Sequence, residues 1–336
     1  MRDPGFWWDK PGLRSALLSP FALLYGAVAA QRMQKNGARC GVPVLCVGNF
    51  TLGGAGKTPT AIMIAQMLKA DGLSPFCLTR GYGGSEAGPR LVDADTDSGD
   101  AVGDEALLLA RTVPTIVARD RVAGAKAAVA AGADVVVMDD GLQNPSLVKD
   151  FTLAVVDAGR LIGNARVFPA GPLRAPLDAQ LKRTDAMLVI GDNDAGHDGG
   201  PRDIAAEAPH LKVFRGRLVP DPAAVAALHG RQVLAFAGIG DPAKFFATAA
   251  AAGIDVVQRR RFDDHHRFSG EDAGDLIMQA EREGLALLTT EKDRARMAGD
   301  PLLTALAAKA HVLPVTLVVD DADGLRRLML DRLGPR

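Results

Sequence analysis

Residues 44–60 read VLCVGNFTLGGAGKTPT, an apolar run followed by a glycine-rich loop and a helical pattern. A strand, a loop and a helix in this order form the cradle that many proteins build for nucleotide phosphates. In such a loop the backbone N–H groups point at phosphate oxygens, a lysine contacts the outer phosphates and a hydroxyl ligates Mg²⁺. The candidate nucleotide-binding residues are therefore Thr51, Leu52, Gly53, Gly54, Ala55, Gly56, Lys57 and Thr58.

The loop departs at one position from the common pattern G-x-x-x-x-G-K-[ST], because Thr51 stands where that pattern has its first glycine. A glycine-rich turn from a strand into a helix also occurs as a packing turn in α/β proteins. The loop alone therefore indicates phosphate binding without excluding a purely structural role.

The composition is that of a soluble globular protein. The length of 336 residues favours two domains, 48% of the residues are hydrophobic, 24% are charged, and the net charge at pH 7 is −1. This balance provides no basic field, so we expect no nucleic-acid partner and a local cluster for any anionic ligand. Cys40, Cys46 and Cys77 lack C-x-x-C spacing and predict neither a zinc site nor a disulfide framework.

Apolar runs alternate with helical patterns along the chain, which predicts a parallel sheet flanked by helices. The expected strands are 42–47, 75–79, 114–118, 134–138, 151–156 and 186–190, and, beyond a glycine- and aspartate-rich stretch at 191–203, 212–219, 233–238, 254–260, 286–290 and 312–319. We expect an α/β fold of the P-loop NTPase type, with a doubly wound, mostly parallel sheet and a second, smaller α/β domain. The expected limits are 1–40 for an N-terminal helical segment of the first domain, 41–200 for the P-loop domain and 201–336 for the smaller domain.

The N-terminal segment is apolar between basic flanks. No charged residue occurs from Ser15 to Gln31, and aromatic side chains stand at Trp7, Trp8 and Phe21. This pattern is typical of an interfacial helix that lies in a membrane surface or docks a lipid. An amphipathic helix packed on the first domain accounts for it equally well, and the sequence leaves both interpretations open.

Two adjacent carboxylates follow a buried strand in VVVMDDGLQN, residues 135–144. In a doubly wound sheet ligands gather at the carboxyl ends of the strands, so Asp139 and Asp140 are expected beside the phosphate loop. Such a carboxylate holds Mg²⁺ directly or through water, because Mg²⁺ prefers hard oxygen ligands. A plain Asp-Asp-Gly turn is the structural alternative.

Two further polar clusters could carry proton transfer. Asp104 and Glu105 begin a helical run, where acidic residues are also favoured by the helix dipole alone. The run DDHH at 263–266 places histidines beside carboxylates, which suits a proton-transfer pair better than a metal site, although a polar loop explains it as well.

Arginines follow several expected strand ends and stiff turns. Arginine in such places suits bidentate contacts to phosphate, but isolated surface arginines are common in loops. The candidates are Arg80, Arg119, Arg121 and Arg174.

Taken in order, seven motifs resemble the tetraacyldisaccharide 4′-kinase family of lipid A synthesis over almost the whole chain. They are the loop at 51–58, TRGYGG at 79–84, GDE at 103–105, DDGLQ at 139–143, PAGPLR at 169–174, DDHH at 263–266 and TTEKD at 289–293. The resemblance implies transfer of the γ-phosphate of ATP, with Mg²⁺, to the 4′-hydroxyl of an acylated glucosamine disaccharide 1-phosphate, giving lipid IVA. It also implies work at the cytoplasmic face of the inner membrane, with a lipid substrate and no obligate protein partner.

The resemblance also implies roles for individual residues. Asp104 and His265 would form the dyad that takes the proton from the attacking hydroxyl, and Asp139 would complete the catalytic group. The metal ligands would be Thr58, Glu105, Asp139 and Gln143. The residues that meet substrate or ATP would be Arg80, Tyr82, Arg119, Arg121, Asp140 and Arg174.

The chain departs from the family pattern at two positions. Asn144 stands where a histidine is usual, and Ala175 stands where an acidic residue is common. The main alternative is a regulatory ATPase with a deviant phosphate loop, but such proteins carry a signature lysine where this chain has Leu52. A nucleotide-binding module without turnover is a third interpretation.

Overall fold

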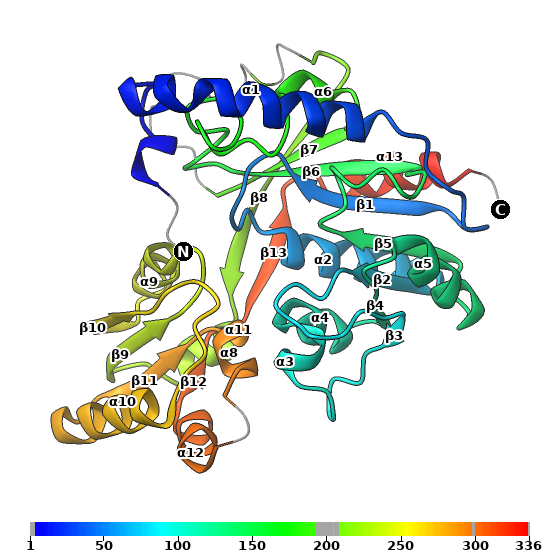
Figure 1. Ribbon diagram of the computed structural model, residues 1–336. Helices are drawn as coiled ribbons and strands as arrows, with labels where there is room; N and C mark the ends of the chain where they lie inside the picture. Colours follow the sequence, from blue (N-terminus) through cyan, green and yellow to red (C-terminus); the bar gives the residue numbers. More distant parts are fainter. Residues whose placement is uncertain (1–3, 192–203, 205–207, 298–299, 335–336) are drawn as a thin grey trace.

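Two β-sheets organise the molecule, which is described by a computed structural model for residues 4–191, 204, 208–297 and 300–334. Within these residues, one sheet has nine strands and the other has four. They lie in separate parts, called here the large lobe and the small lobe (Figure 1).

The large sheet has the order β13-β8-β7-β6-β1-β5-β2-β4-β3. Its strands are β1 (Val44–Asn49), β2 (Pro75–Thr79), β3 (Arg90–Leu91), β4 (Thr115–Val117), β5 (Val135–Asp139), β6 (Phe151–Asp157), β7 (Ala186–Ile190), β8 (Lys212–Pro220) and β13 (Val315–Val319). All neighbouring pairs run parallel except β3 with β4 and β8 with β13, at the two edges. The central strands are buried on both faces, as a parallel sheet between helices requires.

Helices cover both faces of the large sheet, so the predicted doubly wound, mostly parallel sheet is confirmed. Side chains of α2 (Lys57–Ala70) and α13 (Ala322–Leu333) join one core cluster with the sheet, and those of α5 (Arg121–Ala130) join another. Other helices of this lobe, within the described residues, are the 3-10 helix η1 (Gly5–Trp7), α1 (Leu13–Met33), α3 (Gly99–Val102), α4 (Asp104–Ala110) and α6 (Leu177–Leu181).

The small lobe is a parallel sheet of order β10-β9-β11-β12, inserted between β8 and β13 of the large sheet. Its strands are β9 (Gln232–Ala237), β10 (Asp255–Arg261), β11 (Ala286–Thr289) and β12 (His311–Val312). Its helices are α8 (Pro222–Ala226), α9 (Pro242–Ala251), α10 (Gly270–Glu283), α11 (Glu291–Ala295) and α12 (Pro301–Lys309). In Figure 1, β8 and β13 run from the large lobe down to the small one.

The strand membership differs from the sequence expectation in two respects. β8 and β13 lie in the large sheet, whereas a boundary at residue 201 placed both with the small lobe. The expected strand 312–319 is divided into β12 and β13, because Pro314 between them has no N–H to continue a ladder. Apart from Gly191, the stretch 191–203 lies outside the described residues.

Helix α1 packs on the large lobe through a narrow row of small residues. Ser15, Ala22 and Gly26 are buried, and a Cβ on Gly26 would lie 3.4 Å from Cγ of Pro176. The opposite side exposes an apolar row at Leu13, Leu17, Phe21, Leu24 and Val28. By length and composition, α1 is the one helix among the described residues that could cross a membrane.

Candidate active site

The phosphate loop leaves the end of β1 and enters α2. Asn49 braces it, since Nδ2 donates hydrogen bonds to the carbonyl oxygens of Thr51, at 2.7 Å, and Gly53, at 3.2 Å. Gly56 caps α2 with φ of 90°, and a Cβ there would lie 2.8 Å from Cδ1 of Ile190. Glycine is therefore required at the point where the first N–H groups of α2 open toward the loop.

Lys57 places a cation inside this loop. Its side chain is 10% exposed, and Nζ lies 3.4 Å from the carbonyl oxygen of Gly53 and 3.9 Å from Oδ1 of Asp140. Burial lowers the pKa of Lys57, and the charge of Asp140 opposes that shift. The ammonium thus lies where an anionic ligand of the loop would meet it.

Asp140 and Arg174 connect the loop to the turn that follows β5. Nη1 of Arg174 donates to both carboxylate oxygens of Asp140, at 2.8 and 3.0 Å, and Nε donates to the carbonyl oxygen of Thr51 at 2.8 Å. Burial acts to raise the pKa of Asp140, but the charges of Lys57 and Arg174 outweigh it and hold the pKa below its ordinary value. Both predicted residues therefore lie at the loop.

Asp139, at the end of β5, is completely buried, and neither of its oxygens has a hydrogen-bond partner in the described part of the chain. Burial, followed by the charges of Glu105 and Asp140, raises the pKa of Asp139 to about 7. A buried carboxylate without a partner is costly, and it suits a bound cation. The described residues hold no group of three or more His, Cys, Asp or Glu side chains arranged as a metal site, but Mg²⁺ needs only one or two carboxylates.

Asp139→Asn is expected to stabilise the metal-free protein at pH 8 and to have little effect on its stability at pH 3.5. Asp139 binds a proton more tightly in the folded protein, so stability is lost as the pH rises from the ordinary value of 3.8 through about 7. At about 1.4 kcal/mol for each unit of pKa, the gain in free energy of unfolding amounts to a few kcal/mol. Urea unfolding in EDTA at both pH values measures it. A variant less stable than the parent at pH 8 would contradict this account of Asp139.

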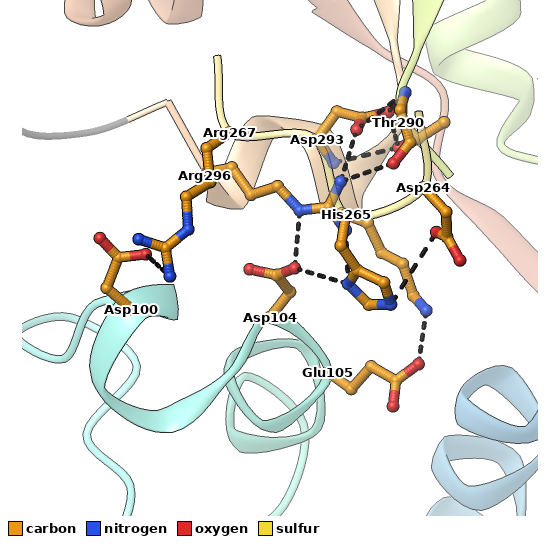
Figure 2. Close-up of polar contacts among 11 residues, drawn as sticks. Asp100, Asp104, Glu105, Asp264, His265, Arg267, Thr290, Asp293 and Arg296 are labelled. Atoms are coloured by element: carbon orange, nitrogen blue, oxygen red, sulfur yellow. Dashed lines mark hydrogen bonds and ion pairs between the residues drawn. The ribbon is translucent and has the colours of Figure 1, made fainter. Parts of the chain in front are cut away.

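Asp104 and His265 meet across the interface between the lobes (Figure 2). Asp104 is the first residue of α4 in the large lobe, and His265 follows β10 in the small lobe. Nδ1 of His265 lies 3.5 Å from Oδ2 of Asp104, and Nε2 lies 3.8 Å from Oδ1 of Asp264. Asp104 and His265, predicted as a proton-transfer pair, thus lie side by side although they are 161 positions apart in the sequence.

Basic side chains of the small lobe hold both carboxylates of the GDE motif. Nε of Arg296 donates to Oδ2 of Asp104 at 2.6 Å, and Nζ of Lys292 donates to Oε1 of Glu105 at 2.7 Å. Burial acts to raise the pKa of Asp104, but His265 and Arg296 keep it below its ordinary value. The charge of Lys292 lowers the pKa of Glu105 to about 2. Both carboxylates are therefore anionic at neutral pH.

Glu105 links this pair electrostatically to the phosphate loop. Its charge acts on Lys57 and on Asp139, and the charges of Lys57 and His265 act on it in turn. The phosphate loop, the buried Asp139 and the carboxylate–imidazole pair therefore form one site.

The sequence profile of one family, described as Tetraacyldisaccharide-1-P 4'-kinase, matches residues 14–334. The chain belongs to this family. The tetraacyldisaccharide 4'-kinase of Methylobacterium sp. strain 4-46 is 55% identical, over 100% of both chains. Its namesake from Rhodopseudomonas palustris strain CGA009 is 53% identical, over 99% of this chain and 96% of its own length.

A solved structure extends the similarity to the fold. The crystal structure of the "apo" form of LpxK from Aquifex aeolicus, in complex with ATP, has a TM-score of 0.74 at 26% identity and covers 96% of this chain and 100% of its own. The family predicted from the ordered motifs is thus confirmed, and the protein is a kinase. The regulatory-ATPase alternative is excluded.

The remaining predicted residues of this kinase occupy different surroundings. Nε2 of Gln143 donates to the carbonyl oxygen of Asn49 and to Oε1 of Gln180, at 2.8 and 2.7 Å. The ring of Tyr82 lies 5.2 Å from that of His265, and Arg80 is exposed at the end of β2.

Arg119 and Arg121 contact backbone carbonyls. Arg119 Nη2 donates to Ser85 O at 3.2 Å, whereas Arg121 is buried and its Nη1 donates to Ala118 O. At the positions that depart from the family pattern, Asn144 Oδ1 accepts from the backbone N–H of Ser146, and Ala175 is buried.

Sequence reasoning missed three cations and a bracing amide. Lys292 and Arg296 hold Glu105 and Asp104, Lys149 Nζ donates to the carbonyl oxygens of Gly141 and Leu142 at 2.6 and 2.9 Å, and Asn49 braces the phosphate loop. TTEKD at 289–293 was the available signal for Lys292, whereas no pattern in the sequence singled out Arg296 or Lys149.

Proposed function

We propose that this kinase transfers the γ-phosphate of ATP to the 4′-hydroxyl of a tetraacyl glucosamine disaccharide 1-phosphate, giving lipid IVA. The observation that carries the proposal is the contact between Asp104 and His265. The neighbouring Glu105 interacts electrostatically with both His265 and Lys57, which connects this pair to the phosphate loop. A phosphate cradle with a carboxylate–imidazole pair beside it suits transfer to a hydroxyl. The family and the ATP complex of LpxK agree with this reaction.

The phosphate loop would bind the triphosphate. Successive N–H groups from Gly53 to Thr58 and the amino end of α2 favour anionic oxygens, and Lys57 adds a full charge. Arg174, held between Asp140 and the loop, offers a further guanidinium to phosphate.

The oxygen donors beside the loop fit Mg²⁺. Asp139 supplies a buried carboxylate that has no hydrogen-bond partner among the described residues, and the buried Thr58 supplies a hydroxyl at the start of α2. Glu105, now paired with Lys292, and Gln143 are the other proposed ligands. When bound, Mg²⁺ neutralises charge on the phosphates.

Asp104 would accept the proton of the attacking 4′-hydroxyl. Its lowered pKa makes it a weak base, but a weak base suffices when bond breaking to the leaving group runs ahead of proton transfer. His265, whose Nδ1 faces Asp104, orients the carboxylate and offers a route for the proton. As the bond from the γ-phosphorus to the β-phosphate oxygen breaks and ADP leaves, the hydroxyl oxygen bonds to the γ-phosphorus and its proton passes to Asp104.

The lipid substrate implies contact with a membrane, which we place at the cytoplasmic face of the inner membrane. Leu17, Phe21, Leu24 and Val28 follow helical spacing along the exposed side of α1. Basic residues lie in the end turns of the helix, at Arg14 and Arg32, and just beyond its ends, at Lys10 and Lys35, where they would meet anionic headgroups.

Replacing Leu17 and Leu24 together by glutamate is expected to reduce binding to vesicles of anionic phospholipid about tenfold or more, because each exposed leucine loses its apolar contact. Glutamate is a good helix former, so α1 should persist. Vesicle sedimentation measures the effect. Met278→Glu, at an exposed apolar position on α10, is the matched control and should bind as the parent does. Equal binding by all three proteins would contradict the role of α1.

Radiolabelled ATP separates a kinase from a protein that only binds or hydrolyses nucleotide. With Mg²⁺ and the acylated disaccharide 1-phosphate in mixed micelles, we expect label from the γ-phosphate in the lipid. Release of inorganic phosphate at the same rate with and without lipid, and no labelled lipid, would overturn the proposed function.

A further inference from the structure

The geometry points to Arg296 as the positioning residue that holds the carboxylate of Asp104 against the imidazole of His265 across the lobe interface. This inference rests on the proposed function, because it concerns the pair that is to take the proton. It adds a residue that lies outside the seven motifs and beyond the end of TTEKD.

Arg296 is fixed firmly to the small lobe. It follows the last residue of α11, its side chain is 6% exposed, and Nη1 donates to Oδ1 of Asp293 at 3.0 Å and to the carbonyl oxygen of Gly238 at 2.7 Å. Asp293 is itself buried and accepts hydrogen bonds from the N–H of Gly238 and from Oγ1 of Thr290. The guanidinium therefore has one preferred position.

Gly238, which accepts a hydrogen bond from Arg296, also fixes His265. The backbone N–H of His265 donates to the carbonyl oxygen of Gly238 at 3.0 Å, so this oxygen accepts from both His265 and Arg296. His265 has a φ of 57°, a conformation that is strained in a residue other than glycine and persists only where its surroundings fix it. The imidazole and the guanidinium are thus placed as a unit.

From its contacts with Gly238 and Asp293 in the small lobe, the side chain of Arg296 extends to Asp104 in the large lobe. Nε donates to Oδ2 of Asp104 at 2.6 Å, and Nη2 lies 3.4 Å from Nδ1 of His265, which is 3.5 Å from the same carboxylate oxygen (Figure 2). The planar fork of arginine fits these directions at once, which the single ammonium of lysine does not. Without it, Asp104 would lose its only short charged contact among those described, and its place beside His265 would no longer be fixed.

Another ion pair joins the lobes nearby and provides a matched control. Nη2 of Arg267 lies 3.1 Å from Oδ1 of Asp100, in α3, and both side chains are about 70% exposed. Replacing Arg267, like replacing Arg296, removes one positive charge from the small lobe and one ion pair between the lobes, but Arg267 pairs with Asp100 and not with Asp104. An effect of Arg296 that came only from holding the lobes together would be shared by Arg267.

The test is steady-state kinetics of the full-length protein with Arg296→Gln, Arg296→Lys and Arg267→Gln. We expect Arg296→Gln to lower kcat about 100-fold, since a misplacement of about 1 Å costs that much, while KM for ATP changes little. Arg296→Lys should recover a minor part of kcat. Arg267→Gln should behave as the parent. A fourth variant, Arg296→Ala, tests chemical rescue. Added guanidinium ion, at concentrations that do not denature the protein, should partly restore its kcat.

A double-mutant cycle checks that Arg296 acts through Asp104. Adding Arg296→Gln to Asp104→Asn should cost far less than 100-fold, because the carboxylate to be positioned is already gone. Full additivity, or equal kcat for Arg296→Gln and Arg267→Gln, would overturn the inference. If Arg296→Gln does not fold, Arg296→Lys decides, and an unchanged kcat in that variant overturns it. Absence of transfer by the parent would instead overturn the proposed function.

Discussion

Lys57→Met is expected to lower kcat/KM for phosphoryl transfer about 1,000-fold while leaving the protein folded. Lys57 is the cation inside the phosphate loop, with Nζ beside Gly53 and Asp140. Removing by mutation a group that faces a developing anion in a buried site costs about 3–4 kcal/mol of transition-state stabilisation. No other lysine lies within the loop itself.

The fold should survive this change because burial already disfavours the charge of Lys57. Methionine fills a similar volume, and Asp140 keeps its two hydrogen bonds from Arg174. The measurements are transfer of labelled phosphate and thermal unfolding. Lys69→Met, at an exposed position near the end of the same helix, is the control and should retain full activity. Activity of the Lys57 variant within about tenfold of the parent would contradict nucleotide binding at this loop.

Asp104→Asn is expected to lower kcat by about 100- to 10,000-fold with little change in affinity for ATP, as removal of a general base does. The amide keeps the size of the carboxylate but cannot accept the proton of the hydroxyl. Asp104 contacts Arg296 and His265 and makes no described contact with the phosphate loop, so nucleotide binding should persist.

Single-turnover kinetics and titration with a fluorescent ATP analogue separate the two effects. Asp100→Asn, in the neighbouring helix α3 and largely exposed, removes a carboxylate without reaching the pair and should be near the parent. A variant at Asp104 that loses ATP binding, yet transfers phosphate normally from the nucleotide it does bind, would show that Asp104 is not the base.

Much of the fold could be predicted because local patterns decide it. The expected strands 75–79 and 186–190 coincide with β2 and β7, since short apolar runs bounded by polar residues leave little choice of limits. Membership of a sheet is not local. β8 and β13 pair with each other across an inserted lobe of about 95 residues, 220 to 315, and no period in the sequence records that pairing.

The candidate site divides in the same way. Asp139 and Asp140 were predicted beside the phosphate loop because parallel strands end at one edge, and β5 is indeed the neighbour of β1. Arg296 lies 192 positions from Asp104, and its place follows from how two lobes meet. Sequence patterns identify the residues that each lobe contributes to a motif, whereas contacts between lobes depend on packing that only the folded chain contains.

The position of the new phosphate tests the central claim most directly. The product made from ATP and the acylated disaccharide 1-phosphate should be isolated and examined by phosphorus–proton correlation NMR. The proposed mechanism expects a second phosphate monoester whose phosphorus couples to the proton at C4′. A product phosphorylated elsewhere, or unchanged disaccharide beside hydrolysed ATP, would contradict it.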